Sequence, residues 1–357
     1  MKVRKSRMML EDKRDIFKLV ELFYAYIKGS VELNYFPLGV RIEPTNHCNL
    51  RCRMCPTSLA YKKGFVSREK GFMDMGLYKK IIDEMKLFPK SSLYPHITLY
   101  LGGESLLHPG IIDMIKIAKK SGFTVHFNTN SVLLTPEISL ALLESRIDLI
   151  NFSFDDVPKE KFEAFRRNSN YDLVLRNIIN FLKLKKKGGF DGTLVKIAGL
   201  KIGGGVKSPI KASAGFANKF KGLPLDSIDI LQAHRWSGTF KKQFISKKEA
   251  GFFQEYYPCH MLWRDITIGW NGKVHGCCYD VLGEEVIGDV QKDSLHEVWN
   301  NERFRELRRL HQEGMYYKIK LCRGCELLGG RVNFWGFWKD FGPFVKKNML
   351  VRTKSLS

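Results

Sequence analysis

Residues 38–232 alternate short β-rich runs with amphipathic helical patterns, and this alternation constrains the fold more than any other feature of the chain. The β-rich runs predict six strands, at Val40–Pro44, His96–Gly102, Thr124–Asn128, Asp148–Phe154, Leu194–Lys201 and Ser227–Gln232. Helical spacing of apolar residues predicts helices at Gly76–Leu87, Gly110–Lys120, Pro136–Glu144, Lys159–Phe165, Leu173–Lys186 and, where nearby glycines also favour a loop, Lys211–Lys219. Such alternation forms right-handed βαβ units around a parallel sheet, so an α/β fold is expected.

Polar residues follow the first four predicted strands. A cysteine loop follows the first strand, and the other three segments are Gly102-Gly103-Glu104-Ser105, Asn128-Thr129-Asn130 and Ser153-Phe154-Asp155. Parallel barrels carry their active sites on the loops after the strands. A glycine pair lets a ligand approach the backbone, and the carboxylate that follows can bind an ammonium group. These segments are therefore the candidate site.

The cysteine loop places Cys48, Cys52 and Cys55 in the order C-x-x-x-C-x-x-C. Three thiolates so close together can bind an iron–sulfur cluster or zinc, because cysteine sulfur is the soft ligand that both prefer. Structural zinc sites use four ligands, whereas three leave one position of the metal centre open. The alternative is a set of buried cysteines, or a disulfide pair with a spare thiol.

A second group of cysteines comprises Cys259, Cys277, Cys278, Cys322 and Cys325, and residues 56–258 contain none. In a reducing compartment such clustering favours metal binding over disulfides. Asn271-Gly272 predicts a type I′ hairpin between runs 265–270 and 273–276, which brings the first two of these cysteines together. A helix is expected from Ser294 to Gln312, with Ser294 and Glu297 as a capping box. By themselves, four thiolates fit a zinc ribbon as well as a cluster.

The cysteine loop and the Gly-Gly-Glu segment resemble those of radical S-adenosylmethionine (SAM) enzymes. The resemblance implies that Cys48, Cys52 and Cys55 bind a [4Fe-4S] cluster whose fourth iron binds SAM. It implies a partial (β/α)6 TIM-like barrel, in which Gly102, Gly103 and Glu104 bind the SAM amino group. Ser105 stands where the family has proline, which is expected to loosen the turn slightly. Ser153 and Asp155, with Arg166 rather than Arg167, would contact the SAM carboxylate and ribose.

The second cysteine group is similar to the twitch, a shortened SPASM domain, in its pattern Cys259-x12-Gly272-x4-Cys277 followed by Cys322-x2-Cys325. This resemblance implies a small hairpin-plus-helix domain after the barrel. It would hold one auxiliary [4Fe-4S] cluster on those four cysteines. The remaining thiol, Cys278, is a small buried residue, a substitute ligand or a candidate catalytic hydrogen donor.

The resemblance implies reductive cleavage of SAM to a 5′-deoxyadenosyl radical that abstracts hydrogen from a substrate, with the auxiliary cluster in electron transfer. Twitch enzymes resemble sugar and aminoglycoside dehydrogenases and epimerases, whereas SPASM enzymes more often modify peptides. No leader-binding domain of about 80 residues precedes Cys48, so an oxidoreductase or epimerase with a carbohydrate-like or other small substrate is expected. A peptide-modifying maturase is the alternative.

The net charge is +22, and such a surface suits an acidic flavodoxin or ferredoxin as electron donor, anionic lipid, or nucleic acid. Lysine-rich surfaces also occur only to keep proteins soluble. A non-enzymatic, metal-stabilised nucleic-acid-binding protein is the alternative of another class. It leaves the Gly-Gly-Glu segment and the open three-cysteine loop unexplained.

The chain divides into a basic amphipathic helix at 1–37, the barrel at 38–240, the auxiliary domain at 241–330 and a tail at 331–357. The first helix is expected to pack on the next domain, with a membrane surface as the alternative. Its apolar residues at helical spacing are Ile16, Val20, Leu22, Phe23 and Ile27. Residues 203–208 predict a loop over the barrel mouth, and the aromatic tail predicts a hydrophobic seal or, as the alternative, membrane contact. No apolar run reaches the roughly 18 residues that span a bilayer, and the start lacks a signal peptide, so a cytoplasmic location is expected.

Overall fold

The computed structural model describes residues 13–58, 68–91, 94–201, 210–232, 256–323 and 325. The predicted loop at 203–208 and the predicted seal at 331–357 lie outside the described residues.

A nine-stranded sheet forms the centre of the molecule, in the order β6-β5-β4-β3-β2-β1-β7-β8-β9. Its strands are β1 Gly39–Ile42, β2 His96–Leu99, β3 Thr124–Thr129, β4 Leu149–Ser153, β5 Leu194–Lys201, β6 Ser227–Gln232, β7 Asp265–Ile268, β8 Lys273–His275 and β9 Val286–Asp289. All pairs from β6 to β7 are parallel, and only β8 and β9 run antiparallel to their neighbours. The predicted parallel barrel core is confirmed.

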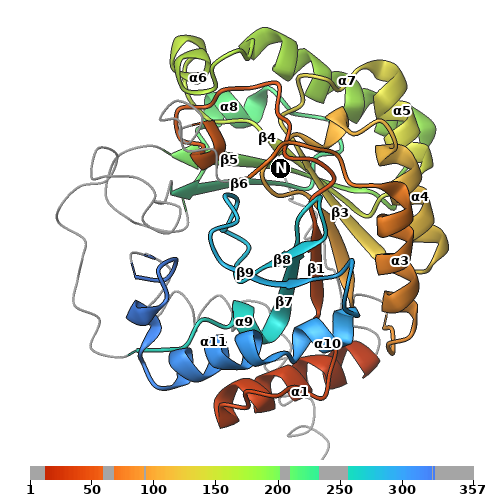
Figure 1. The fold of residues 1–357 in the computed structure, drawn as a ribbon. Helices are drawn as coiled ribbons and strands as arrows, with labels where there is room; N and C mark the ends of the chain where they lie inside the picture. The colour runs from red at the N-terminus through yellow and green to blue at the C-terminus, as the bar shows by residue number, and fades with distance from the viewer. Residues whose placement is uncertain are drawn as a thin grey trace, which may run out of the picture.

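The helices between the parallel strands lie on the outer side of the curved sheet (Figure 1). They are α3 Met75–Lys86, α4 Ile111–Lys120, α5 Pro136–Glu144, α6 Lys159–Phe165, α7 Tyr171–Gly188 and α8 Ala214–Asn218. Local residues set their ends: Thr135 accepts a hydrogen bond from the Ile138 amide at the start of α5, and Gly189, with φ +65°, ends α7. All six predicted helices are therefore present, with ends that shift by a few residues.

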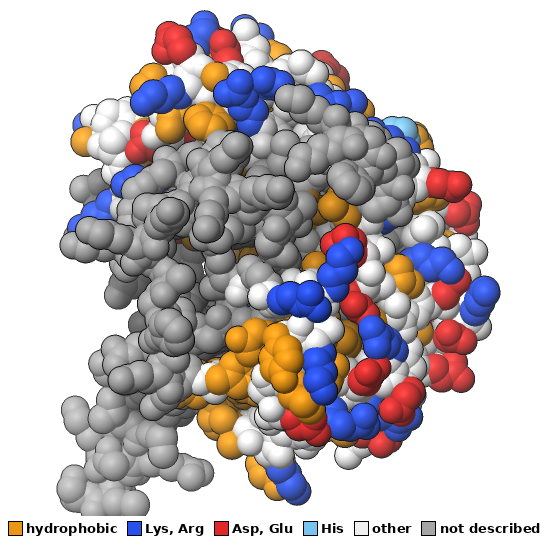
Figure 2. Space-filling model, turned by 60° about the vertical axis from the view of Figure 1, so that its left-hand side comes forward, with side chains coloured by type: hydrophobic (Ala, Val, Ile, Leu, Met, Phe, Trp, Pro, Cys, Tyr) orange, Lys and Arg blue, Asp and Glu red, His pale blue; other side chains and the backbone are white. Residues whose placement is uncertain are grey.

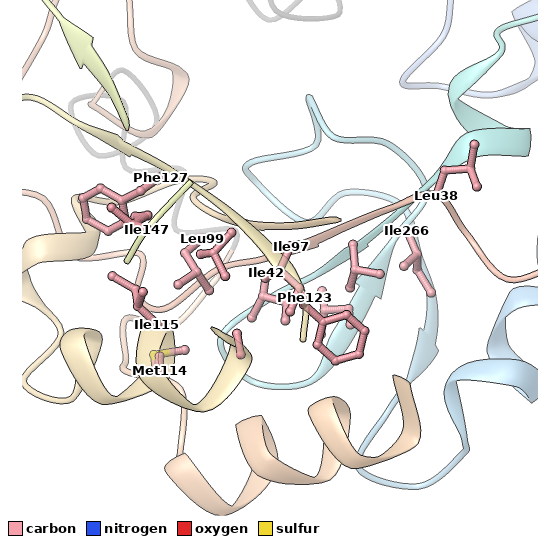
Figure 3. Packing of buried hydrophobic residues seen from close by; sticks show 14 of the residues in the cluster. Leu38, Ile42, Ile97, Leu99, Met114, Ile115, Phe123, Phe127, Ile147 and Ile266 are labelled. Carbon is pink, nitrogen blue, oxygen red and sulfur yellow. The ribbon is translucent and has the colours of Figure 1, made fainter. Parts of the chain in front are cut away.

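Apolar residues at every second strand position pack against these helices and form the core. Figure 3 shows Ile42, Ile97, Leu99 and Phe127 from the strands packed near Met114 and Ile115 of α4. Side chains alternate between the two faces of a strand, so the residues between these apolar ones point to the opposite face. That face carries polar side chains, which are described below.

The predicted hairpin is present, and it continues the barrel sheet. The hairpin is formed, with β7 and β8 antiparallel, but the predicted type I′ turn is wrong, because Gly272 has φ +77° whereas Asn271 does not have the positive φ that this turn also requires. Instead, the Gly269 amide donates to the Lys273 carbonyl at 2.8 Å, and Gly272 ends a three-residue loop. β7 also pairs parallel with β1, in the register Val40 with Ile266. The auxiliary segment thus shares one sheet with the barrel, a long-range pairing that the local pattern did not reveal. A short helix, α9 Met261–Arg264, precedes β7.

The single helix predicted from Ser294 to Gln312 is wrong. Two helices occur, α10 Leu295–Trp299 and α11 Glu302–Gln312, and the predicted capping box of Ser294 begins the first. The break lies at two asparagines: Asn301 accepts from the Phe304 amide as a new cap, and Asn300 exchanges two hydrogen bonds with the backbone of Leu33. Asparagine side chains compete with helical hydrogen bonds in this way. The 3₁₀ turn Tyr316–Lys318 follows α11.

The N-terminal helix, α1 Lys13–Lys28, packs against α9, where the Tyr26 ring meets Trp263 edge-on at 5.5 Å. The expectation that it packs on the folded chain is confirmed. The predicted face is partly wrong, because Val20 is 45% exposed and Ile27 is 60% exposed. The side chain of Ile16 lies outside the described residues.

Figure 2 shows hydrophobic side chains gathered low on one face, at the height of α1 in Figure 1, and Lys, Arg, Asp and Glu mixed elsewhere on that face. No helix in the described part of the chain is long and apolar enough to cross a membrane.

Candidate active site

The cysteine loop begins just after Glu43, a buried carboxylate at the end of β1. Glu43 accepts hydrogen bonds from the backbone amides of Gly102, at 3.0 Å, and Trp270, at 3.2 Å, and it also pairs with Arg68. One carboxylate therefore ties together the loops after β1, β2 and β7. It fixes where the cysteine loop leaves the sheet.

The loop is held against the end of α6 by backbone hydrogen bonds. The Arg51 amide donates to the Arg167 carbonyl at 3.0 Å, and the Arg53 amide donates to the Phe165 carbonyl at 2.8 Å. Within the loop, the Leu50 amide donates to Cys48 Sγ at 3.4 Å. An amide that points at sulfur stabilises a thiolate, so the local backbone suits cluster ligands.

The three thiols of the loop are half-buried and free of disulfides. Burial raises the pKa of Cys48 to about 12 and that of Cys52 to about 11, and each is further raised by its neighbouring cysteines. A positively charged partner such as iron would favour the thiolate form of these groups, because the thiolate is the metal ligand. Among the residues that the structure describes, no three His, Cys, Asp or Glu side chains are arranged around a single ion. A cluster places each thiolate on a different iron atom, so three free thiols in one loop fit it.

The glycine pair after β2 is required by the cysteine loop itself. A Cβ on Gly103 would lie 2.3 Å from the Thr45 carbonyl oxygen and 2.5 Å from that of His47. A Cβ on Gly102 would lie 2.8 Å from Glu43 Oε1. Glycine at both positions lets the ends of β1 and β2 approach each other. The binding of SAM by these two glycines stays a prediction.

Glu104 is almost fully buried, and its carboxylate connects neighbouring loops. Oε2 accepts from the Asn130 amide at 2.8 Å, and Oε1 accepts from the Leu106 amide at 3.2 Å. Burial raises the pKa of Glu104, and these hydrogen bonds only partly oppose that effect. The Asn130 side chain in turn donates to Asn49 of the cysteine loop at 2.8 Å. Glu104 thus shapes the rim, and its contact with the SAM amino group stays a prediction.

Asp155 and Arg166 form a buried, two-pronged ion pair beside the cysteine loop. Arg166 Nε lies 2.7 Å from Asp155 Oδ2, and Nη2 lies 2.8 Å from Oδ1. Burial lowers the pKa of Arg166, but the Asp155 carboxylate more than reverses this, so the pKa is raised. Arg166 also partly opposes the burial that raises the pKa of the nearby Cys52 thiol, while Arg167 is exposed. Of the two arginines, Arg166 lies at the site, and half-buried Ser153 ends β4 at the same edge.

The five C-terminal cysteines come together although they span residues 259 to 325. Burial raises the pKa of Cys259 to about 12, and the nearby Cys325 and Cys278 thiols raise it further. Burial likewise raises the pKa of Cys322, as do Cys259 and Cys325. The hydrogen bond between Cys277 and Cys278 raises the pKa of Cys277 and lowers that of Cys278 to about 7. The predicted four-thiol set and the spare cysteine therefore occupy one region.

The surroundings of the two adjacent cysteines differ. Cys277 packs against the hydrophobic core, and its sulfur accepts from the Tyr279 amide at 3.4 Å. Cys278 lies within electrostatic range of Arg41 and Asp265. The preference for Cys277 as ligand stays a prediction.

His311 is a further residue of this region. Its Nε2 lies 3.5 Å from Cys322 Sγ, and its Nδ1 lies 3.1 Å from the Tyr256 hydroxyl and 3.3 Å from the Cys259 amide. Sequence reasoning missed His311, Glu43 and Asn49. Glu43 and Asn49 carried one signal, because both stand beside or inside the cysteine motif; His311 carried none, since it belongs to an ordinary helical pattern.

Comparison with known families decides what these two cysteine sites belong to. A model of the radical SAM superfamily matches residues 42–201, and a model of the SPASM iron–sulfur cluster-binding domain matches residues 259–326. The chain contains a radical SAM domain and a SPASM domain. The resemblance noted from the sequence is confirmed.

Two curated relatives illustrate the breadth of similarity. A tungsten-containing aldehyde ferredoxin oxidoreductase cofactor-modifying protein of Pyrococcus furiosus is 39% identical over 119 residues, 33% of this chain and 30% of that protein. An S-adenosyl-L-methionine-dependent 2-deoxy-scyllo-inosamine dehydrogenase of Niallia circulans is 22% identical over 286 residues, 80% of this chain and 91% of that protein. The chain spans between 30% and 61% of the length of three curated relatives that it matches.

Two solved structures share the fold. BtrN in complex with AdoMet and 2-DOIA has a TM-score of 0.53 and 17% identity, covering 82% of this chain and 94% of that one. Streptococcus suis SuiB bound to its precursor peptide SuiA has a TM-score of 0.59 and 15% identity, covering 91% and 78%. Sequences this different share an architecture, and the radical SAM partial barrel is the architecture shared here.

The two domains define the cofactors of this chain. The radical SAM domain binds a [4Fe-4S] cluster and SAM, and the SPASM domain binds auxiliary iron–sulfur. The thiol groups around Cys48 and Cys259 provide donors of the right kind in both regions. The predicted cofactors are confirmed at this level.

Proposed function

We propose that this radical SAM enzyme removes hydrogen from a carbohydrate-like or other small substrate, in a dehydrogenation or an epimerisation. The observation that carries the proposal is the three-thiol loop, which lies at the strand ends beside the Asp155–Arg166 pair. The similarity to the Niallia circulans dehydrogenase supports the substrate class, because it runs over 91% of that protein.

In this proposal Cys48, Cys52 and Cys55 bind the cluster that receives SAM. When bound, SAM and its cluster would supply a 5′-deoxyadenosyl radical able to take a hydrogen atom from the substrate, and in a dehydrogenation the auxiliary cluster would be the acceptor of the remaining electron as the substrate releases a proton. The protein orients SAM through Ser153 and the Arg166 side chain, which Asp155 holds in place. Gly102, Gly103 and Glu104 shape the rim where the SAM amino group binds.

The auxiliary cluster is assigned to Cys259, Cys277, Cys322 and Cys325, and it is a single cluster because only Cys278 remains outside the two sets. With four thiolate ligands it has no open iron, which suits electron transfer rather than SAM binding. A net charge of +22 favours an acidic flavodoxin or ferredoxin as electron donor. The eight cysteines form no disulfide, which favours a reducing compartment such as the cytoplasm.

The decisive experiment is anaerobic reconstitution, followed by iron and sulfide counting and incubation with SAM and dithionite. About eight iron atoms and release of 5′-deoxyadenosine are expected, since each cluster holds four irons. A Cys48→Ala/Cys52→Ala/Cys55→Ala variant should lose about half of the iron and all SAM cleavage. Cleavage that persists in this variant would refute the proposal.

A matched variant separates the two sites. Cys322→Ala/Cys325→Ala should also lose about half of the iron, yet it should keep cleaving SAM. Cys277→Ala should lose the auxiliary cluster and Cys278→Ala should keep it; the reverse result would make Cys278 the ligand. If a substrate is epimerised normally by Cys278→Ala, that thiol is not the hydrogen donor.

A peptide substrate is the second candidate, because the SuiB structure with its precursor peptide covers 91% of this chain. The two candidates are separated by mass spectrometry of reconstituted enzyme incubated with cell extracts split into small-molecule and peptide fractions. With the reaction run in deuterated water, a mass loss of two hydrogens (dehydrogenation) or a gain of one deuterium (epimerisation) in the small-molecule fraction alone supports the proposal, whereas a change in the peptide fraction alone supports the maturase.

A further inference from the structure

The face of the parallel sheet that points away from the helices is unusually polar. Parallel barrels normally fill this side with Val, Ile and Leu. Here the apolar residues of the strands face the helices, and the alternate positions point inward. The polar and charged residues at these inward positions include Arg41, His96, His126, Asn128, Asn151 and Lys196.

Strand register arranges these side chains in two neighbouring rows. Arg41 pairs in register with Thr98, and Thr98 pairs with His126, so Arg41 and His126 share a row across β1, β2 and β3. Asn151 pairs with Asn128 on one side and with Lys196 on the other, in the next row. This second row lies closer to the carboxyl ends of the strands. Both rows therefore lie directly below the candidate SAM residues on the same sheet.

Two atoms of the first row are buried without a hydrogen-bond partner among the described residues. They are Arg41 Nε and His126 Nε2. The His126 ring stacks on His96 with centroids 4.7 Å apart, which holds it in place. By contrast, the Asn151 side-chain Nδ2 donates a hydrogen bond to Asn128 Oδ1 at 2.9 Å. Unpaired buried polar groups are costly, so a pair of them on one face indicates a missing ligand.

The charges on this face indicate what that ligand is. Asp265, a carboxylate within electrostatic range of Arg41, is already paired with Arg264 at 3.0 Å. Within the described part of the chain, neither Arg41 nor Lys196 has an ion-pair partner. Burial lowers the pKa of His126 to about 4, which leaves its ring neutral and able to donate one hydrogen bond. Among the described residues, the face thus carries two cations without an ion-pair partner and a neutral donor.

We propose that Arg41, His126 and Lys196 bind an anionic group of the substrate, either a phosphate or a carboxylate. A guanidinium matches both groups with two parallel hydrogen bonds. Anchored there, the substrate extends towards the strand ends where SAM binds, so its opposite end meets the site of hydrogen abstraction. The inference rests on the proposed function and narrows its substrate class to small molecules that carry an anionic group.

Binding of simple anions tests this directly. Reconstituted enzyme, without SAM or dithionite, is titrated calorimetrically with inorganic phosphate, with acetate and with neutral glucose. Arg41→Met and Lys196→Met should each weaken binding about tenfold or more, the loss expected for one charge-assisted contact. The matched control is Arg309→Met, whose side chain is 47% exposed on α11 and should leave binding unchanged.

The anion whose affinity depends on Arg41 identifies the group, and glucose should not bind measurably in any form. Equal anion affinity in the parent, Arg41→Met and Lys196→Met would overturn the inference. Arg41→Lys tests whether the anion needs the two parallel hydrogen bonds of a guanidinium. If it does, this variant should lose affinity even though the positive charge is kept.

A structural role for Arg41 predicts a different pattern. In that case Arg41→Met should unfold at a lower temperature than Arg309→Met, while Lys196→Met binds anions normally. A binding role predicts no loss of anion-free thermal stability in Arg41→Met, because an unpaired buried cation is removed. Enzyme that cleaves SAM without Arg41-dependent anion binding refutes only this inference. Anion binding without SAM cleavage refutes only the proposed function.

Discussion

Removal of the Asp155 carboxylate is the sharpest test of how the site is built. Asp155 makes both prongs of the pair with Arg166 and also accepts from the Leu200 amide at 2.8 Å. The two side chains are 3% and 9% exposed, so Asp155→Ala leaves a buried guanidinium without its counter-ion. Breaking one side of a buried pair costs about 3–5 kcal/mol. The free energy of unfolding is expected to fall by that amount.

The matched control is Asp83→Ala, which breaks the 2.6 Å pair with Lys86 on the exposed surface of α3. That pair has 67% and 44% exposed side chains, and its loss should change stability by less than about 1 kcal/mol. Equilibrium denaturation in guanidinium chloride, followed by circular dichroism, gives both values. A double variant, Asp155→Ala/Arg166→Leu, should be more stable than Asp155→Ala alone, because no buried charge remains unpaired. Equal losses in Asp155→Ala and Asp83→Ala would refute the reasoning.

Three further predictions concern other parts of the molecule. Gly103→Ala should lower iron content, because a Cβ there would lie 2.3 Å from a backbone oxygen of the cysteine loop, whereas Gly215→Ala, with nothing within 4 Å, should not. Equal iron in both variants would contradict this. His311→Leu should keep its iron but lower the reduction potential of the auxiliary cluster, because the hydrogen bond to Cys322 Sγ stabilises the reduced form. The expected shift is on the order of tens of mV in a redox titration. An unchanged potential would count against this role of His311. Burial raises the pKa of Asp289, but a lysine 2.8 Å away and a backbone amide outweigh this, so the pKa is lowered. The stabilisation that the ionised Asp289 carboxylate gives the folded state is fully present above the unfolded-state pKa of about 3.9. It is lost as the pH falls through the lower pKa of the folded state. Asp289→Asn should therefore denature earlier than the parent at neutral pH but match it in strong acid, and a gap that persists in acid would show another cause.

The strands and helices of the barrel were predictable because their signals are local. Helix α5 has the bounds that its pattern predicted, including Pro136 at its start, and β5 and β6 likewise. The break between α10 and α11 was missed, because Asn300 and Asn301 read as ordinary polar positions until their partners are known. The buried face of α1 was partly misjudged for the same reason. Apolar residues lie on both sides of that helix, and only its packing against α9 selects one.

The cysteine sets were also evident from the sequence, since three or four ligands within short loops carry their own spacing. The surroundings of those sets were not. Glu43 accepts from the Gly102 amide, Asn49 accepts from the Asn130 side chain, and His311 accepts from the Cys259 amide, in each case a residue far along the chain. The residues next to them in the sequence do not indicate these partners.

By itself the sequence determined the parallel α/β core and the two groups of soft ligands, because the period of apolar residues and the spacing of cysteines are properties of short segments. Only the tertiary structure decided that β7 joins β1, that Glu43 links three loops, and that Arg41 and His126 share a row. Those facts depend on strand register and long-range pairing, which emerge when the whole core is buried at once.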